Sequence, residues 1–216
     1  MAKQIIVILA ASAALLAGMW MGYYTKPDMA TGGEPQGIQG TILPSEKIID
    51  AFELTSNRNE AFSNKNLRGK WSLLFIGYTH CPDVCPATLE TVKQVHGLML
   101  EQGLTPPDMV FISVDPERDT SEILDQYVTY FNKDFIGLTG SKENIAGFVK
   151  QLSGYYAKAA GTSGDINNSD YLMDHTASLM LVNPQGNLQA YLSAPHTPMK
   201  VIDGIVRTQA FYAQQK

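Results

Sequence analysis

The sequence has few cysteines and no dense run of basic residues. Only Cys81 and Cys85 occur among 216 residues, and a bond between positions four apart closes too short a loop to stabilise a fold much. A disulfide scaffold is therefore excluded, and the close pair indicates chemistry instead. Sixteen Lys and Arg against 21 Asp and Glu give a formal net charge of -5. Because no basic stretch could follow a phosphate backbone, we expect no nucleic-acid partner.

A long uncharged hydrophobic stretch lies close to the N-terminus, over residues 5–24. Its length suits a helix that crosses a bilayer, and a cleaved signal peptide would have a shorter apolar core. We therefore expect an uncleaved, single-pass transmembrane anchor over residues 1–24. Lys3 precedes the stretch, so the positive-inside bias predicts a cytoplasmic N-terminus and a domain outside the cytoplasm.

The rest of the chain divides into a linker and one domain. Residues 25–45 are rich in Gly and Pro and show no apolar period, which predicts a flexible linker. Residues 46–216 are enough for one domain with a full core. The pattern of this domain begins with two short strands around a polar turn at residues 56–59, where Asn59 tolerates a left-handed conformation.

Strand and helix signals then alternate along the domain. Buried strands are predicted at 71–78 and 109–114, and amphipathic helices after Pro86, after Thr120 and around 145–152. Residues 159–170 are typical of an exposed loop. A hairpin around the turn 183–186 and a last helix capped by Thr197 follow, and we expect this helix to bury Met199, Ile202, Ile205 and Val206.

This order predicts an α/β fold, a mixed sheet flanked by helices, in the order of the thioredoxin architecture. The two cysteines come directly after the first buried strand, where a sheet gives way to a helix and α/β proteins place their sites. The helix N-terminus stabilises thiolates there. Redox thioredoxins separate their cysteines by two residues, whereas the three residues between Cys81 and Cys85 let both sulfurs converge on one ion, so the spacing favours a metal.

Two thiolates are too few for a closed zinc site, so a further ligand has to be His or a carboxylate. Three of the four histidines are poor candidates. His80 adjoins Cys81, and adjacent side chains seldom point at the same ion. His96 falls on the apolar stripe of its helix, which favours a packed histidine, and His196 is typical of a loop.

His175 follows Asp174 and a Gly- and Asn-rich loop, and it is expected to open a strand. A mobile segment could present it at the end of the sheet, although the residues alone leave a ligand and an ordinary loop histidine about equal. Two sulfurs and one imidazole suit Cu(I), and with a weak extra ligand they also hold Cu(II).

Asp83 either orients a ligand or faces a partner. The acidic stretch 115–119 is interpreted as a turn and helix start.

Three motifs in the sequence resemble those of a known protein family. The segments GYTHCPDVCPATL (77–89), SVDPERDT (113–120) and DHT (174–176) occur in the order typical of the Sco/SenC family, which the chain resembles over most of residues 48–210. The resemblance implies a thioredoxin-like fold with Cys81, Cys85 and His175 as copper ligands. Two departures, Met180 for an aromatic residue and Asn59 for glycine, affect local packing only.

The resemblance implies a copper metallochaperone for the copper A centre of cytochrome c oxidase, with the apo copper-bearing subunit as partner. The alternative is a thiol–disulfide oxidoreductase, in which Cys81 and Cys85 form a reversible disulfide and reduce the apo-oxidase or other extracytoplasmic proteins. Other copper chaperones or thiol–disulfide oxidoreductases would be further partners. Copper delivery is favoured because a reductase does not need His175. The short chain suggests the bacterial inner membrane with a periplasmic domain, ahead of an organellar inner membrane.

Overall fold

The structure, a computed structural model, describes residues 38–215. The expected membrane anchor and most of the expected linker lie outside the described residues. Within residues 38–215 no helix is both long and apolar enough to cross a membrane.

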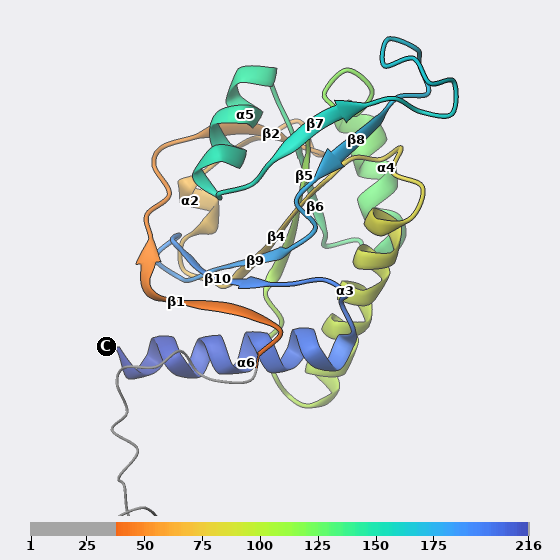
Figure 1. Cartoon of the computed structure of the whole chain (residues 1–216). Helices are drawn as coiled ribbons and strands as arrows, with labels where there is room; N and C mark the ends of the chain where they lie inside the picture. Colours follow the sequence, from red (N-terminus) through yellow and green to blue (C-terminus); the bar gives the residue numbers. More distant parts are fainter. Residues whose placement is uncertain (1–37, 216) are drawn as a thin grey trace, which may run out of the picture. The chain divides into compact units, whose positions relative to one another are not determined.

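An eight-stranded mixed sheet forms the centre of the described part (Figure 1). Strands β4, β5 and β6 are parallel, and every other neighbouring pair is antiparallel. Across the sheet the strands are β1 (Gly40–Lys47), β10 (Leu188–Leu192), β9 (Leu179–Val182), β4 (Ser72–Gly77), β5 (Asp108–Ser113), β6 (Ile136–Thr139), β2 (Glu53–Ser56) and β3 (Ala61–Ser63). The helices are α2 (Asn64–Leu67), α3 (Val84–Glu101), α4 (Ser121–Phe131), α5 (Lys142–Gln151) and α6 (Pro198–Gln214).

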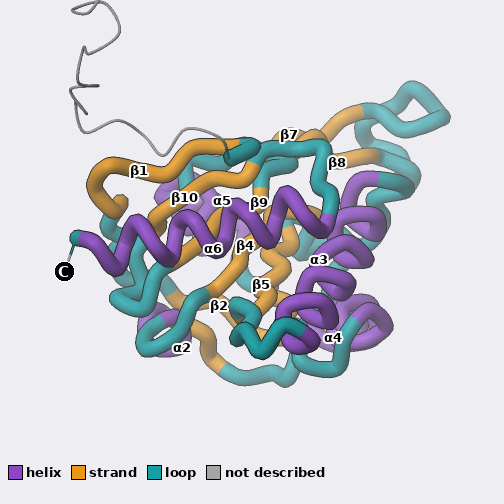
Figure 2. Tube along the Cα trace, turned by 90° about the horizontal axis from the view of Figure 1, so that it is seen from below, coloured by secondary structure: helices purple, strands orange, loops and turns teal. Residues whose placement is uncertain are grey.

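Helices cover both faces of this sheet, which explains why β4 is apolar at nearly every position. Successive side chains of a strand point to opposite faces. Leu73 and Phe75 pack with α3, α4 and α6, whereas Leu74 and Ile76 pack with α2 and α5. Figure 2 shows α6 lying across the strands with α3 and α4 to one side. The predicted mixed sheet flanked by helices is confirmed.

Local turn chemistry also agrees with the sequence. Asn59 has a φ of 59° in the turn between β2 and β3, so it adopts the left-handed conformation that glycine would adopt there. Gly186, with a φ of 83°, ends the turn between β9 and β10. Pro198 is the first residue of α6 after the cap residue Thr197.

The boundary between linker and domain was predicted too late. Residues 40–45 were assigned to the linker, but they belong to β1, where Gly40 pairs with Leu192 and Ile42 with Ala190. Ile42 is only 2% exposed. A Cβ on Gly40 would lie 2.0 Å from the Tyr191 carbonyl oxygen, so this glycine permits close strand pairing rather than flexibility.

A second, two-stranded sheet was not predicted. Strands β7 (Tyr156–Ala159) and β8 (Leu172–His175) pair antiparallel on either side of the exposed loop (Figure 1). His175 therefore ends β8 instead of opening the next strand, which begins at Leu179. Both strands are short and partly exposed, so they lack the apolar alternation that reveals a strand in sequence.

The buried face of α6 differs in part from the prediction. Ile202 and Ile205 are buried as expected, but Met199 is 64% and Val206 40% exposed. The inner face instead includes Gly204, where a Cβ would lie 2.6 Å from Leu192 Cδ2. Because Gly204 has no side chain, the helix can pack closely against Leu192 on this face, which is not the face that hydrophobicity alone favours. The other buried residues of the helix are Val201 and Thr208.

Candidate metal site

The two cysteines lie at the carboxyl end of β4 and the start of α3. The amide of Cys81 donates a hydrogen bond to the Tyr78 carbonyl (3.3 Å), which turns the chain after the strand. Cys85 lies in the first turn of α3 and is fully buried, whereas Cys81 is partly exposed. The Cys85 amide donates to Cys81 Sγ at 3.4 Å. Asp83 is exposed, and its side chain makes no capping hydrogen bond.

His175 reaches the cysteines from the end of β8. Its Nε2 lies 3.4 Å from Cys85 Sγ, and its Nδ1 lies 3.2 Å from the Thr176 carbonyl oxygen. These two contacts orient the ring so that Nε2 faces the sulfurs, the position from which it can bind a metal. The imidazole is held edge-to-face at 5.9 Å from the Phe75 ring and 6.0 Å from the Tyr78 ring.

The structure thus brings together all three residues predicted as ligands. Their donor atoms lie within 4.8 Å of one another, and no other cluster of three or more such donors occurs among residues 38–215. A soft, trigonal set of two sulfurs and one imidazole nitrogen fits Cu(I), and thiolates are needed to bind it.

The environment makes one thiolate available before a metal arrives. Hydrogen bonding from the Cys85 thiol, with further contributions from His175 and the backbone, lowers the pKa of Cys81 to about 3. The same contact with Cys81, together with burial, raises the pKa of Cys85. The first thiolate therefore forms on Cys81, and Cys85 keeps its proton until a cation displaces it.

Asp119 fixes the turn that carries Cys81, a role that the sequence did not reveal. This buried carboxylate accepts hydrogen bonds from the Thr79 amide (2.9 Å), the Thr79 hydroxyl (2.6 Å) and the Ser113 hydroxyl (2.6 Å). It joins the end of β4 to the end of β5. The acidic stretch is thus structural, as predicted, but it supports the site directly.

The other histidines stay outside the three-residue group. His80 has a half-exposed side chain, and its Nδ1 lies 3.1 Å from the Thr79 hydroxyl. His96 packs edge-on against Phe135 at 5.1 Å, and burial lowers its pKa. His196 Nε2 lies 2.9 Å from the Ala177 carbonyl oxygen.

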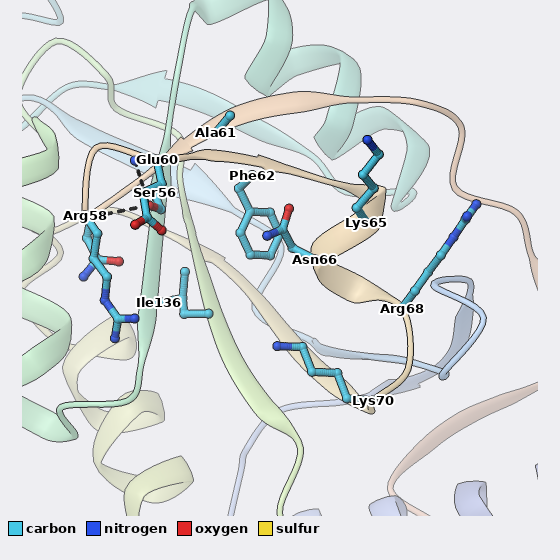
Figure 3. A pocket seen from close by; sticks show the side chains of 11 residues that line it. Ser56, Arg58, Glu60, Ala61, Phe62, Lys65, Asn66, Arg68, Lys70 and Ile136 are labelled. Atoms are coloured by element: carbon cyan, nitrogen blue, oxygen red, sulfur yellow. Dashed lines mark hydrogen bonds between the residues drawn. The ribbon is translucent and has the colours of Figure 1, made fainter.

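A cleft of about 450 Å³ lies at the opposite end of the sheet, and Figure 3 shows its lining side chains. Lys70 precedes β4 and Ile136 begins β6, so this cleft adjoins the amino ends of the parallel strands. Four of its eleven lining residues are basic, Glu60 is its only carboxylate, and it contains no thiol or imidazole. It lacks the donors that a soft metal requires.

The mixed sheet carries a Cys-x-x-x-Cys turn after its central strand, and a histidine faces both thiols. This combination defines a thioredoxin-like protein with a candidate metal-binding site. The fold matches ScoI of Arabidopsis thaliana with copper bound, with a TM-score of 0.69 and 35% identity over 74% of this chain and 97% of that one. It also matches ScoI of Bradyrhizobium japonicum with copper bound, with a TM-score of 0.62 and 34% identity over 74% and 99% of the two chains.

Residues 41–210 match the SCO1/SenC family model. The mitochondrial SCO2 homologue of Bos taurus is 33% identical over 198 residues, which cover 91% of this chain and 72% of the bovine protein. The chain therefore belongs to the SCO1/SenC family, and the resemblance inferred from the three motifs is confirmed.

Proposed function

We propose that this protein binds one copper ion through Cys81, Cys85 and His175 and delivers it to the apo copper-bearing subunit during assembly of the copper A centre of cytochrome c oxidase. The observation that carries the proposal is the convergence of the three donor atoms within 4.8 Å. The solved copper-bound relatives support the choice of metal.

The site has one open side suited to transfer by ligand exchange. Cys85 is buried, whereas Cys81 is partly exposed and can be approached by a thiolate of the recipient. His175 lies at the end of a small sheet outside the main one, so it can withdraw without breaking a strand of the core. Two ligands of the recipient would then replace His175 and the Cys81 thiolate in turn, and Cys85 would release the ion last.

Copper titration of residues 34–216 tests this proposal, and these residues include the whole compact unit that contains the site. Under anaerobic, reducing conditions we expect one Cu(I) ion per chain, and Cu(II) added to the reduced protein after removal of the reductant should produce a thiolate charge-transfer band. Saturation at a different stoichiometry, or binding that survives loss of both cysteines, would contradict the proposal.

Residues 5–24 are proposed to anchor the domain on the outer side of a bacterial inner membrane. The protein should stay with membranes after a high-salt wash while the domain is open to protease added from the periplasmic side. Release of the intact protein by salt alone would overturn the anchor.

Thiol–disulfide exchange is the second candidate, and the two thiols themselves favour it. Cys81 combines partial exposure with a lowered pKa, which suits an attacking thiolate, and Cys85 lies beside it as a resolving thiol. Such a reductase would act on cysteines of the apo-oxidase or on other extracytoplasmic proteins. His175 distinguishes the two functions, because only copper binding needs a third donor.

A further inference from the structure

Tyr171 is buried at the point where the exposed loop enters β8. It is 6% exposed, although the preceding residues of the loop are open to solvent. Its ring lies between two cations, with Arg118 Cζ at 3.6 Å and Lys158 Nζ at 3.7 Å from the ring centroid. Its hydroxyl donates to Asp115 Oδ1 at 2.6 Å. Burial raises the pKa of Tyr171, so the hydroxyl keeps the proton that it donates.

Arg118 joins the same loop to the body of the domain. Its Nε donates to Asp115 Oδ2 at 2.5 Å, and its Nη1 donates to the Ser169 carbonyl at 3.1 Å. The Arg118 side chain is 16% exposed and that of Asp115 only 3%, so solvent screens this pair little. One guanidinium thus bonds to the segment after β5, bonds to the loop before β8, and covers the ring of Tyr171.

The small sheet has few anchors to the body. Among residues 38–215, strands β7 and β8 pair only with each other, and half of the β8 positions are exposed. Tyr156 and Met173 pack against the core, and Lys158 pairs with Glu117. A pocket of about 210 Å³ is lined by Tyr156 and Met173 of the small sheet and by Val114 and Lys142 of the body. Packing beside the small sheet therefore leaves space, and the contacts of Arg118 and Tyr171 are those that hold the start of β8.

We propose that Arg118 and Tyr171 are positioning residues, which clamp the start of β8 and thereby set the distance of His175 from the two thiols. Tyr171 directly precedes the four-residue strand that ends at His175. A strand of this length transmits a displacement at one end to the other. The copper readout below rests on the proposed function, whereas the metal-free readout does not.

Three variants of the full-length protein in detergent test the clamp. Tyr171→Phe keeps the ring but loses the bond to Asp115, Tyr171→Leu also loses both cation contacts, and Arg118→Lys keeps the charge but cannot make both hydrogen bonds. Tyr155→Leu is the matched control, since this side chain also belongs to the small-sheet region but is 63% exposed.

Amide hydrogen exchange of the metal-free proteins gives the first readout. We expect faster exchange over residues 172–175 in Tyr171→Leu and Arg118→Lys, a smaller increase in Tyr171→Phe, and no change in β4 or in the control. If Tyr171→Leu loosens β4 as well, Tyr171→Phe and Arg118→Lys decide the question. Exchange over residues 172–175 that equals wild type in those two variants would overturn the clamp.

Copper transfer to a chelator gives the second readout. We expect at least about tenfold faster transfer from Tyr171→Leu and Arg118→Lys, together with a shifted Cu(II) charge-transfer band, because residues that orient a ligand affect metal affinity about 10–100-fold. Wild-type transfer rates and spectra in both variants would overturn the role in positioning His175. Failure of the wild-type protein to bind copper would overturn the proposed function instead, and hydrogen exchange would still test the clamp.

Discussion

Cys81 and Cys85 differ in exposure and in acidity, although only three residues separate them. In the reduced, metal-free protein we expect an alkylating reagent to modify Cys81 first. Because the pKa of Cys81 is lowered to about 3, its thiolate is already present in mild acid. The rate should therefore change little between about pH 5 and pH 8, where an ordinary thiol slows about tenfold per unit. Peptide mapping by mass spectrometry identifies the modified residue.

Bound copper should protect Cys81 in the same assay. Equal labelling of Cys85, which is fully buried, would show that the first turn of α3 opens more readily than this structure implies. A rate that falls steeply below neutral pH would contradict the assignment of the thiolate to Cys81.

Gly77, the last residue of β4, provides space for the Cys85 sulfur. A Cβ at this position would lie 2.7 Å from Cys85 Sγ and 2.6 Å from Phe111 Cε2, and both atoms are buried. We expect Gly77→Ala to reduce the free energy of unfolding by about 1–3 kcal/mol and to weaken copper binding, since the sulfur has to move. Chemical denaturation and a copper titration measure the two effects.

Gly97 in the middle of α3 is the matched control, because a Cβ there would meet nothing within 4 Å. Gly97→Ala should leave copper binding unchanged and raise stability by up to about 1 kcal/mol, as alanine favours a helix. If both substitutions had the same effect on stability and on copper binding, close packing around Gly77 would not explain why this position is a glycine.

At the scale of elements, the sequence predicted best where the signal is local. The apolar run of β4, the Asn-Pro-Gln-Gly turn and the Thr197–Pro198 helix start each depend on a few neighbouring residues, and each lies where expected. Strand β1 was not predicted because Gly40 and Pro44 are typical of linkers. The strand with which it pairs, β10, lies about 150 residues away in the sequence. Strands β7 and β8 are too exposed to show a pattern.

In the candidate site, too, local features were predictable from the sequence and distant ones were not. The spacing of Cys81 and Cys85 predicts their proximity, whereas His175 lies 90 residues beyond Cys85 and depends on the pairing of β7 with β8. Motif resemblance supplied that partner. The roles of Asp119 and Tyr171 were not predicted, because an acidic residue in a turn and a tyrosine beside a polar loop have ordinary local explanations.

Strand β1 leads to a prediction about truncation. A protein that starts at residue 46 keeps only the end of β1, exposes the edge of β10 and loses Ile42 from the core. Compared with residues 34–216, we expect it to lose about 2–5 kcal/mol of stability, from one buried aliphatic side chain and several backbone hydrogen bonds. Thermal and denaturant unfolding of the two proteins check this, with residues 38–216 as a control that keeps β1. Equal stability of all three would mean that β1 contributes little.

At the scale of the whole molecule, metal binding and thiol exchange use the same two sulfurs and separate at one side chain. His175→Ala leaves both thiols in place, so thiol–disulfide exchange with a small substrate should change little. Binding of Cu(II) should weaken and its charge-transfer band should disappear, while Cu(I) is affected less because two thiolates can hold it in a linear arrangement.

The most direct test is cytochrome c oxidase activity in cells that carry His175→Ala in place of the wild-type protein, with Cys81→Ser and His80→Ala alongside. Copper delivery through all three donors predicts that His175→Ala and Cys81→Ser both abolish the activity, and that His80→Ala, which alters a half-exposed side chain outside the group, retains it. Wild-type activity in His175→Ala together with its loss in Cys81→Ser would contradict copper delivery and assign the function to thiol reduction.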